Sequence, residues 1–189
     1  MTNIFDNLRK IAQSLEALEA GRGRIVAIDG RCCAGKSTLA AKMREAFCAG
    51  IIHMDDFFLP AELRTPQRYA QAGGNIHHER FAEEVIPFLH TGEGFSYRIF
   101  DCKKMDYNGV RQVAPSLLRV IEGAYSHHPV LGDYMSIRAF YDVETQIQRE
   151  RIIKRNGEEA AALFFAKWIP LEEEYLRVYK IQENAHVTL

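Results

Sequence analysis

The sequence Gly30-Arg31-Cys32-Cys33-Ala34-Gly35-Lys36-Ser37 decides the fold of this chain, because it has the spacing G-x-x-x-x-G-K-[ST]. A short apolar run at 24–29 precedes it, and a run rich in strong helix formers at 38–47 follows it. Strand, glycine loop and helix in this order form a phosphate-binding loop. The glycines let several backbone N–H groups converge on one anion, and the helix N-terminus adds partial positive charge. We expect Lys36 to reach the β- and γ-phosphates and the Ser37 hydroxyl to bind Mg²⁺. The alternative is a glycine-rich turn with a solvated lysine.

The composition is that of an ordinary globular domain. The 189 residues suffice for one domain with a substantial core, and 47% of them are hydrophobic. The net charge of −1 gives no electrostatic reason to expect a nucleic-acid or membrane partner. No run approaches the roughly 18 apolar residues that span a bilayer, and Asp6 and Glu16 make the N-terminal stretch unlike a signal peptide. Cys32 and Cys33 are adjacent inside the phosphate loop, so we expect free thiols and a cytoplasmic protein.

Helical and strand-like patterns alternate along the chain. Ile4 to Leu18 predicts an amphipathic helix that ends at Gly21 and Gly23. Strands are expected at 24–29, 51–54, 95–101, 117–121, 136–143 and 185–189. Further helices are expected at 38–47, 79–89 and 146–154, and at 158–176 around a break at Pro170. The alternation predicts an α/β sheet with helices on both faces.

Carboxylates follow two of the expected strands. Asp55 and Asp56 come directly after 51–54, and Glu122 follows 117–121. Ligands of open α/β sheets bind outside the carboxyl ends of the strands. Of the two adjacent acids, one can accept a proton from an attacking hydroxyl and the other can help to hold Mg²⁺. A helix N-cap beside a solvated acid is the structural alternative.

The order and spacing of these segments resemble the uridine kinase-like branch of the P-loop kinases, from about Gly21 to the C-terminus. That branch holds uridine/cytidine kinases, nicotinamide riboside kinases, phosphoribulokinase and bacterial pantothenate kinase. Besides the phosphate loop, the matching segments are Met54 to Phe58, Gly73-Gly74-Asn75 with Glu79-Arg80-Phe81, Tyr97 to Asp101, Ile121-Glu122-Gly123 and Arg149 to Arg155. The resemblance implies a P-loop NTPase fold in a single domain, 1–189. Such a fold has three α/β/α layers, a mostly parallel five-stranded sheet and a small helical lid, here near 149–160.

The resemblance also implies roles for individual residues. Asp55 corresponds to the acid that activates the acceptor hydroxyl, and Glu122 to a second acid near Mg²⁺ and the substrate. The expected metal ligands are Ser37, Asp55 and Glu122, and the expected catalytic residues are Lys36, Asp55, Arg151 and Arg155. The expected substrate-binding residues are Asp55, Phe57, His77, Tyr97, Arg98, Phe100 and Glu122. Aromatic faces suit a flat base, although plain core packing accounts for Tyr97 and Phe100 equally well.

Three arginines, Arg149, Arg151 and Arg155, resemble lid residues that close over the phosphates. Phosphoryl transfer needs positive charge on the equatorial oxygens, and a planar guanidinium supplies it bidentately. The alternative is a solvated helix face, since Arg151 and Arg155 are four residues apart.

The chain departs from many of the relatives at two places. Where they carry an acid that contacts the sugar hydroxyls, this chain has His77, which is followed by His78. A neutral imidazole can still hydrogen-bond a diol, but it is not a fixed anion. The lid has Asn156-Gly157-Glu158-Glu159 where many relatives have Arg-Gly-Arg.

The sequence therefore predicts an ATP-dependent, Mg²⁺-dependent kinase for a small molecule. ATP is expected at Gly30, Arg31, Cys32, Cys33, Ala34, Gly35, Lys36, Ser37 and Thr38. The expected acceptor is the 5′-hydroxyl of uridine or cytidine, with nicotinamide riboside, pantothenate or another hydroxylated metabolite as alternatives. Two further alternatives are a P-loop regulator without rapid transfer and a nucleotide kinase that uses Arg64, Arg68 and Arg80. The choice of ATP over GTP and a homo-oligomeric state are left open.

Overall fold

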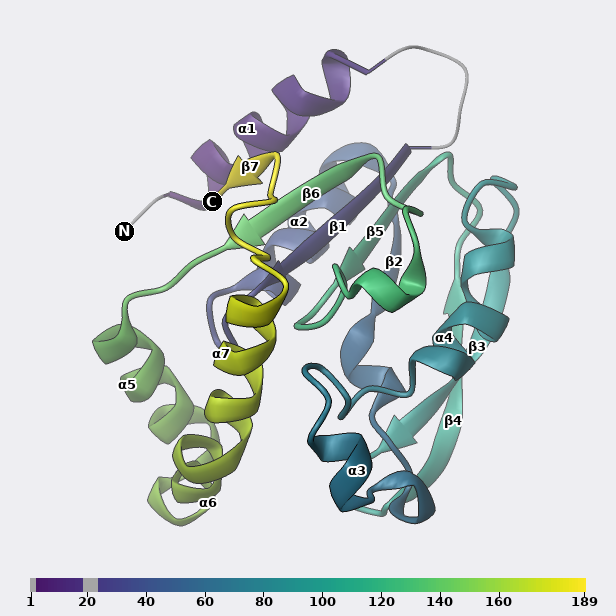
Figure 1. Ribbon diagram of the computed structural model, residues 1–189. Coiled ribbons are helices and arrows are strands. Elements are labelled where there is room, and N and C mark those ends of the chain that lie inside the picture. The colour runs from purple at the N-terminus through teal and green to yellow at the C-terminus, as the bar shows by residue number, and fades with distance from the viewer. Residues whose placement is uncertain (1–2, 19–23) are drawn as a thin grey trace.

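The computed structural model describes residues 3–18 and 24–189 (Figure 1). Five strands form one sheet in the order β2-β5-β1-β6-β7, and every pairing in it is parallel. The strands are β1 (Arg24–Gly30), β2 (Gly50–His53), β5 (Leu118–Glu122), β6 (Ile137–Tyr141) and β7 (Val187–Thr188). The mostly parallel five-stranded sheet expected from the sequence is confirmed.

Helices cover both faces of this sheet. Successive β1 residues point to opposite faces, so Val26 and Ile28 join one core and Ile25 and Ala27 the other. The first core is closed by α1 (Ile4–Glu16) and α2 (Lys36–Phe47), and the second by α7 (Ile169–Val178) and the segments that follow β2. Figure 1 shows α7 in front of the sheet and α2 behind it. The result is three α/β/α layers.

A separate antiparallel hairpin of β3 (Phe95–Asp101) and β4 (Asp106–Val113) stands beside the main sheet. The sequence predicted β3 but not β4. Seven of the eight β4 residues are wholly or partly exposed, so the strand has no buried alternation to reveal it.

The helix expected at 79–89 is shorter in the structure. α4 spans His78–Glu84, and a 3₁₀ turn, η3 (Ile86–Phe88), replaces the remainder. Pro87 supplies no N–H and disfavours helical geometry at the residue before it, so the prediction was too long. Between β2 and α4 lie two 3₁₀ turns, η1 (Met54–Phe57) and η2 (Ala61–Leu63), and the short helix α3 (Pro66–Tyr69).

The C-terminal helices run on through Pro170 rather than breaking there. The turn η4 (Pro129–Leu131) lies between β5 and β6. After β6 come α5 (Thr145–Asn156), α6 (Glu158–Leu163), a π-helical turn η5 (Phe164–Trp168) and α7. Pro170 occupies the first turn of α7, where a missing N–H costs little. The widened turn before it takes the place of the expected break.

Two further observations complete the fold. Gly21 and Gly23, where the first helix was expected to end, lie outside the described residues, and α1 itself ends at Glu16. Among the helices that the structure describes, none combines the length and the apolar character needed to cross a membrane.

Candidate functional site

The phosphate loop joins β1 to α2 and has a constrained backbone. Gly30 has φ +125°, and a Cβ there would lie 2.2 Å from the carbonyl oxygen of Tyr141. Gly35 has φ +122° and caps α2. Only glycine satisfies the close approach at Gly30. The side chain of Lys36 folds back along the loop, where Nζ donates to the carbonyl oxygens of Gly30 at 2.6 Å and Arg31 at 2.8 Å.

Parallel pairing brings the expected metal ligands to one edge of the sheet. β1 lies beside β5, and β5 beside β2, so the groups that follow these strands are neighbours. The Ser37 hydroxyl donates to Oε2 of Glu122 at 3.0 Å, and Oε1 of Glu122 lies 2.5 Å from Nδ1 of His53. Glu122 is 5% exposed. The sequence did not single out His53, which ends β2 without a motif of its own.

The two adjacent acids have different surroundings. Asp55 is exposed to solvent. Partial desolvation and the Glu122 carboxylate raise the pKa of Asp55, while Lys36 and Arg155 oppose the shift. Asp56 is buried and accepts hydrogen bonds from Arg111 Nε at 2.6 Å and from the Tyr97 hydroxyl at 3.0 Å. The Asp55 carboxylate is therefore open to solvent, whereas Asp56 braces the hairpin against η1.

Three aromatic residues expected to bind substrate are buried. The exposed fractions of Phe57, Tyr97 and Phe100 are 0%, 2% and 3%. Phe57 packs against Tyr97 with ring centroids 5.0 Å apart, and the Tyr97 hydroxyl accepts the His53 N–H at 3.0 Å. Their rings belong to the core next to the site and expose little aromatic surface to a ligand.

The remaining two expected acceptor residues differ in position. Arg98 alternates outward on β3 and pairs with Glu84 of α4 at 2.6 Å, so the structure does not bring it to the cluster around Asp55. His77 is half-buried just before α4, its N–H donates to the Phe57 carbonyl at 2.7 Å, and partial burial lowers its pKa. Nδ1 of His77 has no hydrogen-bond partner among the described residues.

The expected lid arginines extend from α5 toward the phosphate loop. Arg151 Nη1 donates to the carbonyl oxygens of Cys33 at 2.9 Å and Ala34 at 3.0 Å. Arg155 lies over the Phe164 ring, and its positive charge acts on both Asp55 and Cys33. Arg149 instead stacks on Phe165 at 4.3 Å. Arg151 and Arg155 therefore lie nearer the loop and the acids than Arg149 does.

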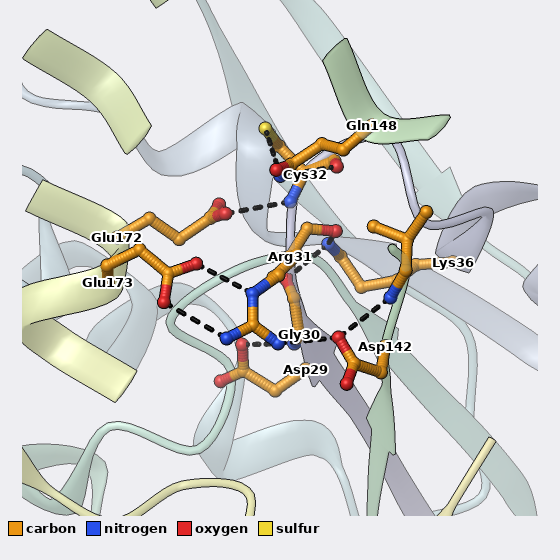
Figure 2. Close-up of polar contacts among 10 residues, drawn as sticks. Asp29, Gly30, Arg31, Cys32, Lys36, Asp142, Gln148, Glu172 and Glu173 are labelled. Atoms are coloured by element: carbon orange, nitrogen blue, oxygen red, sulfur yellow. Dashed lines mark hydrogen bonds and ion pairs between the residues drawn. The ribbon is translucent and has the colours of Figure 1, made fainter. Parts of the chain in front are cut away.

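Residues of β1 and α7 that the sequence did not single out also fix the loop (Figure 2). Asp29 is fully buried and accepts the Gly30 N–H at 2.7 Å and the Tyr175 hydroxyl at 2.7 Å. Glu173 of α7 binds Arg31 through both carboxylate oxygens, and Glu172 accepts the Cys32 N–H at 2.8 Å. In the sequence, 172–174 is simply an acidic run, typical of a solvated helix face.

No family model matches the chain, and no curated protein matches it. Several solved structures match the chain. A protein from Bacillus stearothermophilus described as a possible uridine kinase has a TM-score of 0.73 at 16% identity, covering 100% of both chains. A candidate fructose transport system kinase from Silicibacter sp. TM1040 has a TM-score of 0.70 at 22% identity, again covering 100% of both. The chain has the fold of the P-loop kinases.

A third structure extends the range of P-loop kinase folds that resemble this chain. D-glycerate 3-kinase from Cryptococcus neoformans var. grubii has a TM-score of 0.55 at 13% identity, covering 91% of this chain and 85% of that one. The three structures carry three different descriptions: a possible uridine kinase, a candidate fructose transport system kinase and D-glycerate 3-kinase. The fold alone therefore does not select an acceptor.

The residues of this P-loop kinase fold suit a magnesium nucleotide. Within 3–18 and 24–189, no group of three or more His, Cys, Asp or Glu side chains is placed to hold a metal ion by itself. Mg²⁺ in phosphoryl-transfer sites needs only one or two protein oxygens, because phosphates and water supply the others. Ser37 and Glu122, already in contact, are of that kind. The exposed first turn of α2, with Ser37 and Thr38, leaves room for phosphate.

Proposed function

We propose that the protein transfers the γ-phosphoryl group of ATP to a hydroxyl of a small metabolite. The observation that carries this proposal is the arrangement at one sheet edge. The phosphate loop with Lys36, the Ser37–Glu122 pair and the open carboxyl of Asp55 follow three adjacent strands. A donor site and a candidate base therefore share one edge.

In this mechanism the loop N–H groups and Lys36 hold the triphosphate, and Ser37 with Glu122 would hold Mg²⁺. The ion, when bound, neutralises charge on the phosphate oxygens. Asp55 accepts the proton of the acceptor hydroxyl as its oxygen attacks phosphorus. Arg155 and Arg151 would move onto the phosphates and exclude water, which otherwise competes as a nucleophile.

The finer proposal from the sequence is a ribonucleoside acceptor, phosphorylated on its 5′-hydroxyl. Similarity to a fold described as a possible uridine kinase supports it. The burial of Phe57, Tyr97 and Phe100 weakens it, because stacking on a base needs an open aromatic face. Nicotinamide riboside and pantothenate stay in the test as alternative acceptors.

Arg64 favours a second acceptor class, a small hydroxy acid or sugar phosphate. Its half-buried guanidinium lies 5.9 Å from the Phe100 ring centroid and donates from Nε to the Leu59 carbonyl at 2.7 Å. No carboxylate among the described residues pairs with it. Both Arg64 and Asp55 act on the pKa of Cys102, which burial raises, so both charges lie near that thiol. A guanidinium so placed would bind an acceptor's carboxylate or phosphate.

The test is ADP formation from MgATP with a panel of nucleosides, vitamins, hydroxy acids and sugar phosphates. The proposal predicts that at least one acceptor raises ADP formation well above the hydrolysis background. An Arg64→Gln variant should lose an anionic acceptor selectively and keep a neutral one. If no acceptor raises ADP formation while MgATP still binds, a P-loop regulator becomes the better interpretation.

A further inference from the structure

Two consecutive acids of α7 contact two consecutive residues of the phosphate loop (Figure 2). Glu173 pairs with Arg31, with Oε1 at 2.7 Å from Nε and Oε2 at 3.0 Å from Nη2. Glu172 Oε1 accepts the backbone N–H of Cys32 at 2.8 Å. These residues lie about 140 positions apart in the chain. The loop is therefore held by a helix outside its own strand–loop–helix unit.

The two contacts differ in charge and burial. The Glu173 side chain is 41% exposed and forms an ordinary ion pair with the Arg31 guanidinium. Glu172 is 5% exposed, and the group that donates a hydrogen bond to it is a neutral N–H. The nearby cation is Lys36, whose Nζ donates to two loop carbonyls rather than to this carboxylate. Glu172 is thus a buried acid without a dedicated counter-charge.

The charged and polar groups around Glu172 come from several elements. Lys36 and Cys32 belong to the loop and α2, Asp29 to β1, Tyr125 to the segment after β5, and Glu173 to α7. Burial raises the pKa of Glu172 to about 7, Lys36 and the Cys32 N–H oppose this shift, and Asp29 and Glu173 add to it. Near neutral pH the carboxyl is therefore poised between its charged and neutral forms.

We propose that Glu172 is a positioning residue of the phosphate loop, and that its carboxyl takes up a proton when a nucleoside triphosphate binds. The inference rests on the proposed function, because it requires MgATP at the loop. The incoming phosphates bring negative charge to the same loop and engage Lys36, so an ionised Glu172 loses the stabilising charge of Lys36. The proton comes from solvent and ends on a Glu172 oxygen. The neutral acid still accepts the Cys32 N–H through its carbonyl oxygen, so the loop keeps its position.

Because nucleotide binding and protonation of Glu172 are coupled, the affinity for MgATP should depend on pH. If nucleotide raises the pKa of Glu172 by about one unit, affinity for MgATP weakens up to about tenfold as pH rises through the range where Glu172 ionises. Phosphate groups of ATP also titrate near pH 6, so the comparison must be made against a variant that cannot ionise. Glu172→Gln keeps an acceptor oxygen for the Cys32 N–H and has no charge.

The experiment is isothermal titration of MgATP near pH 7 in two buffers of different ionisation enthalpy, with the full chain. The wild type should take up about 0.4 of a proton more than Glu172→Gln, given a free-protein pKa of about 7 and a rise of about one unit on binding. Glu174→Gln is the matched control, since Glu174 is exposed on the same helix and pairs with Arg177. It should behave as the wild type.

The outcomes separate the inference from the function beneath it. Equal proton uptake by wild type and Glu172→Gln, or a difference in affinity that is constant from pH 6.5 to 8.5, overturns the inference and leaves the kinase proposal standing. If Glu172→Gln does not fold, proton uptake near zero in the wild type across that range overturns it as well. If the wild type binds no MgATP at all, the proposed function fails and the inference fails with it.

Discussion

Replacing Tyr97 by phenylalanine tests whether the hairpin is braced against the acid pair. The Tyr97 hydroxyl donates to Asp56 at 3.0 Å and accepts the His53 N–H at 3.0 Å. Loss of a hydrogen bond to a charged group costs about 1.5–3 kcal/mol, and an unpaired buried N–H about 1–3 kcal/mol. Asp56 retains both contacts from Arg111, which offsets part of the loss. We expect Tyr97→Phe to lower the free energy of unfolding by about 2–4 kcal/mol.

The assay is urea unfolding followed by circular dichroism, with thermal unfolding beside it. For a chain of this length, about 3 kcal/mol corresponds to a fall of about 10 °C in Tm. Tyr107→Phe is the control, because Tyr107 is 36% exposed and its hydroxyl has no hydrogen bond among the described residues. It should change stability by less than about 0.5 kcal/mol. Equal stability of the two variants would refute the bracing role of Tyr97.

Three other predictions concern Gly30, Glu172 and Asp55. Gly30→Ala should unfold the chain or lower the free energy of unfolding by more than about 4 kcal/mol, because the new Cβ meets the Tyr141 carbonyl. Gly109→Ala is the control: with φ +97° and open space around it, it should lower that free energy by only about 1–2 kcal/mol. Urea unfolding measures both. Burial raises the folded-state pKa of Glu172 from 4.5 to about 7, so wild-type stability should fall as pH rises between these two values. Relative to Glu172→Gln, the free energy of unfolding should fall by an amount on the order of 3 kcal/mol. A difference in unfolding free energy that does not change with pH would contradict this. The pKa of Asp55 is raised and the base must be ionised, so kcat/KM should decline on the acid side at a pH above the ordinary aspartate range. Asp55→Asn should lower kcat by a factor of about 10²–10⁴.

Local patterns in the sequence were enough to place the donor side of the site. The glycine spacing from Gly30 to Ser37 fixes a strand, a loop and a helix in order, and the apolar runs fix the neighbouring strands. Once the strands are parallel, Asp55 and Glu122 must follow their ends at one edge. Ser37 and Glu122 are in contact for this reason.

The contacts of Glu172 and Arg111 could not be predicted in this way. Each lies on an element with no motif, and each meets its partner through tertiary packing. β4 in particular is exposed along most of its length, so its pattern does not show that Arg111 reaches Asp56. Aromatic residues raised the opposite difficulty. Tyr97 and Phe100 suit a core and a binding face equally in sequence, and only burial distinguishes the two.

The central claim is that donor and acceptor meet at the carboxyl edge of the sheet, with Asp55 between them. The most direct measurement follows phosphorus itself, by ³¹P NMR of wild type and Asp55→Asn with MgATP and the best acceptor of the panel. The account predicts a phosphorylated acceptor formed in equal amount to ADP by the wild type, and a much slower rate in the variant. ADP that accumulates with inorganic phosphate and no phosphorylated acceptor, or transfer that is as fast in Asp55→Asn, would contradict it.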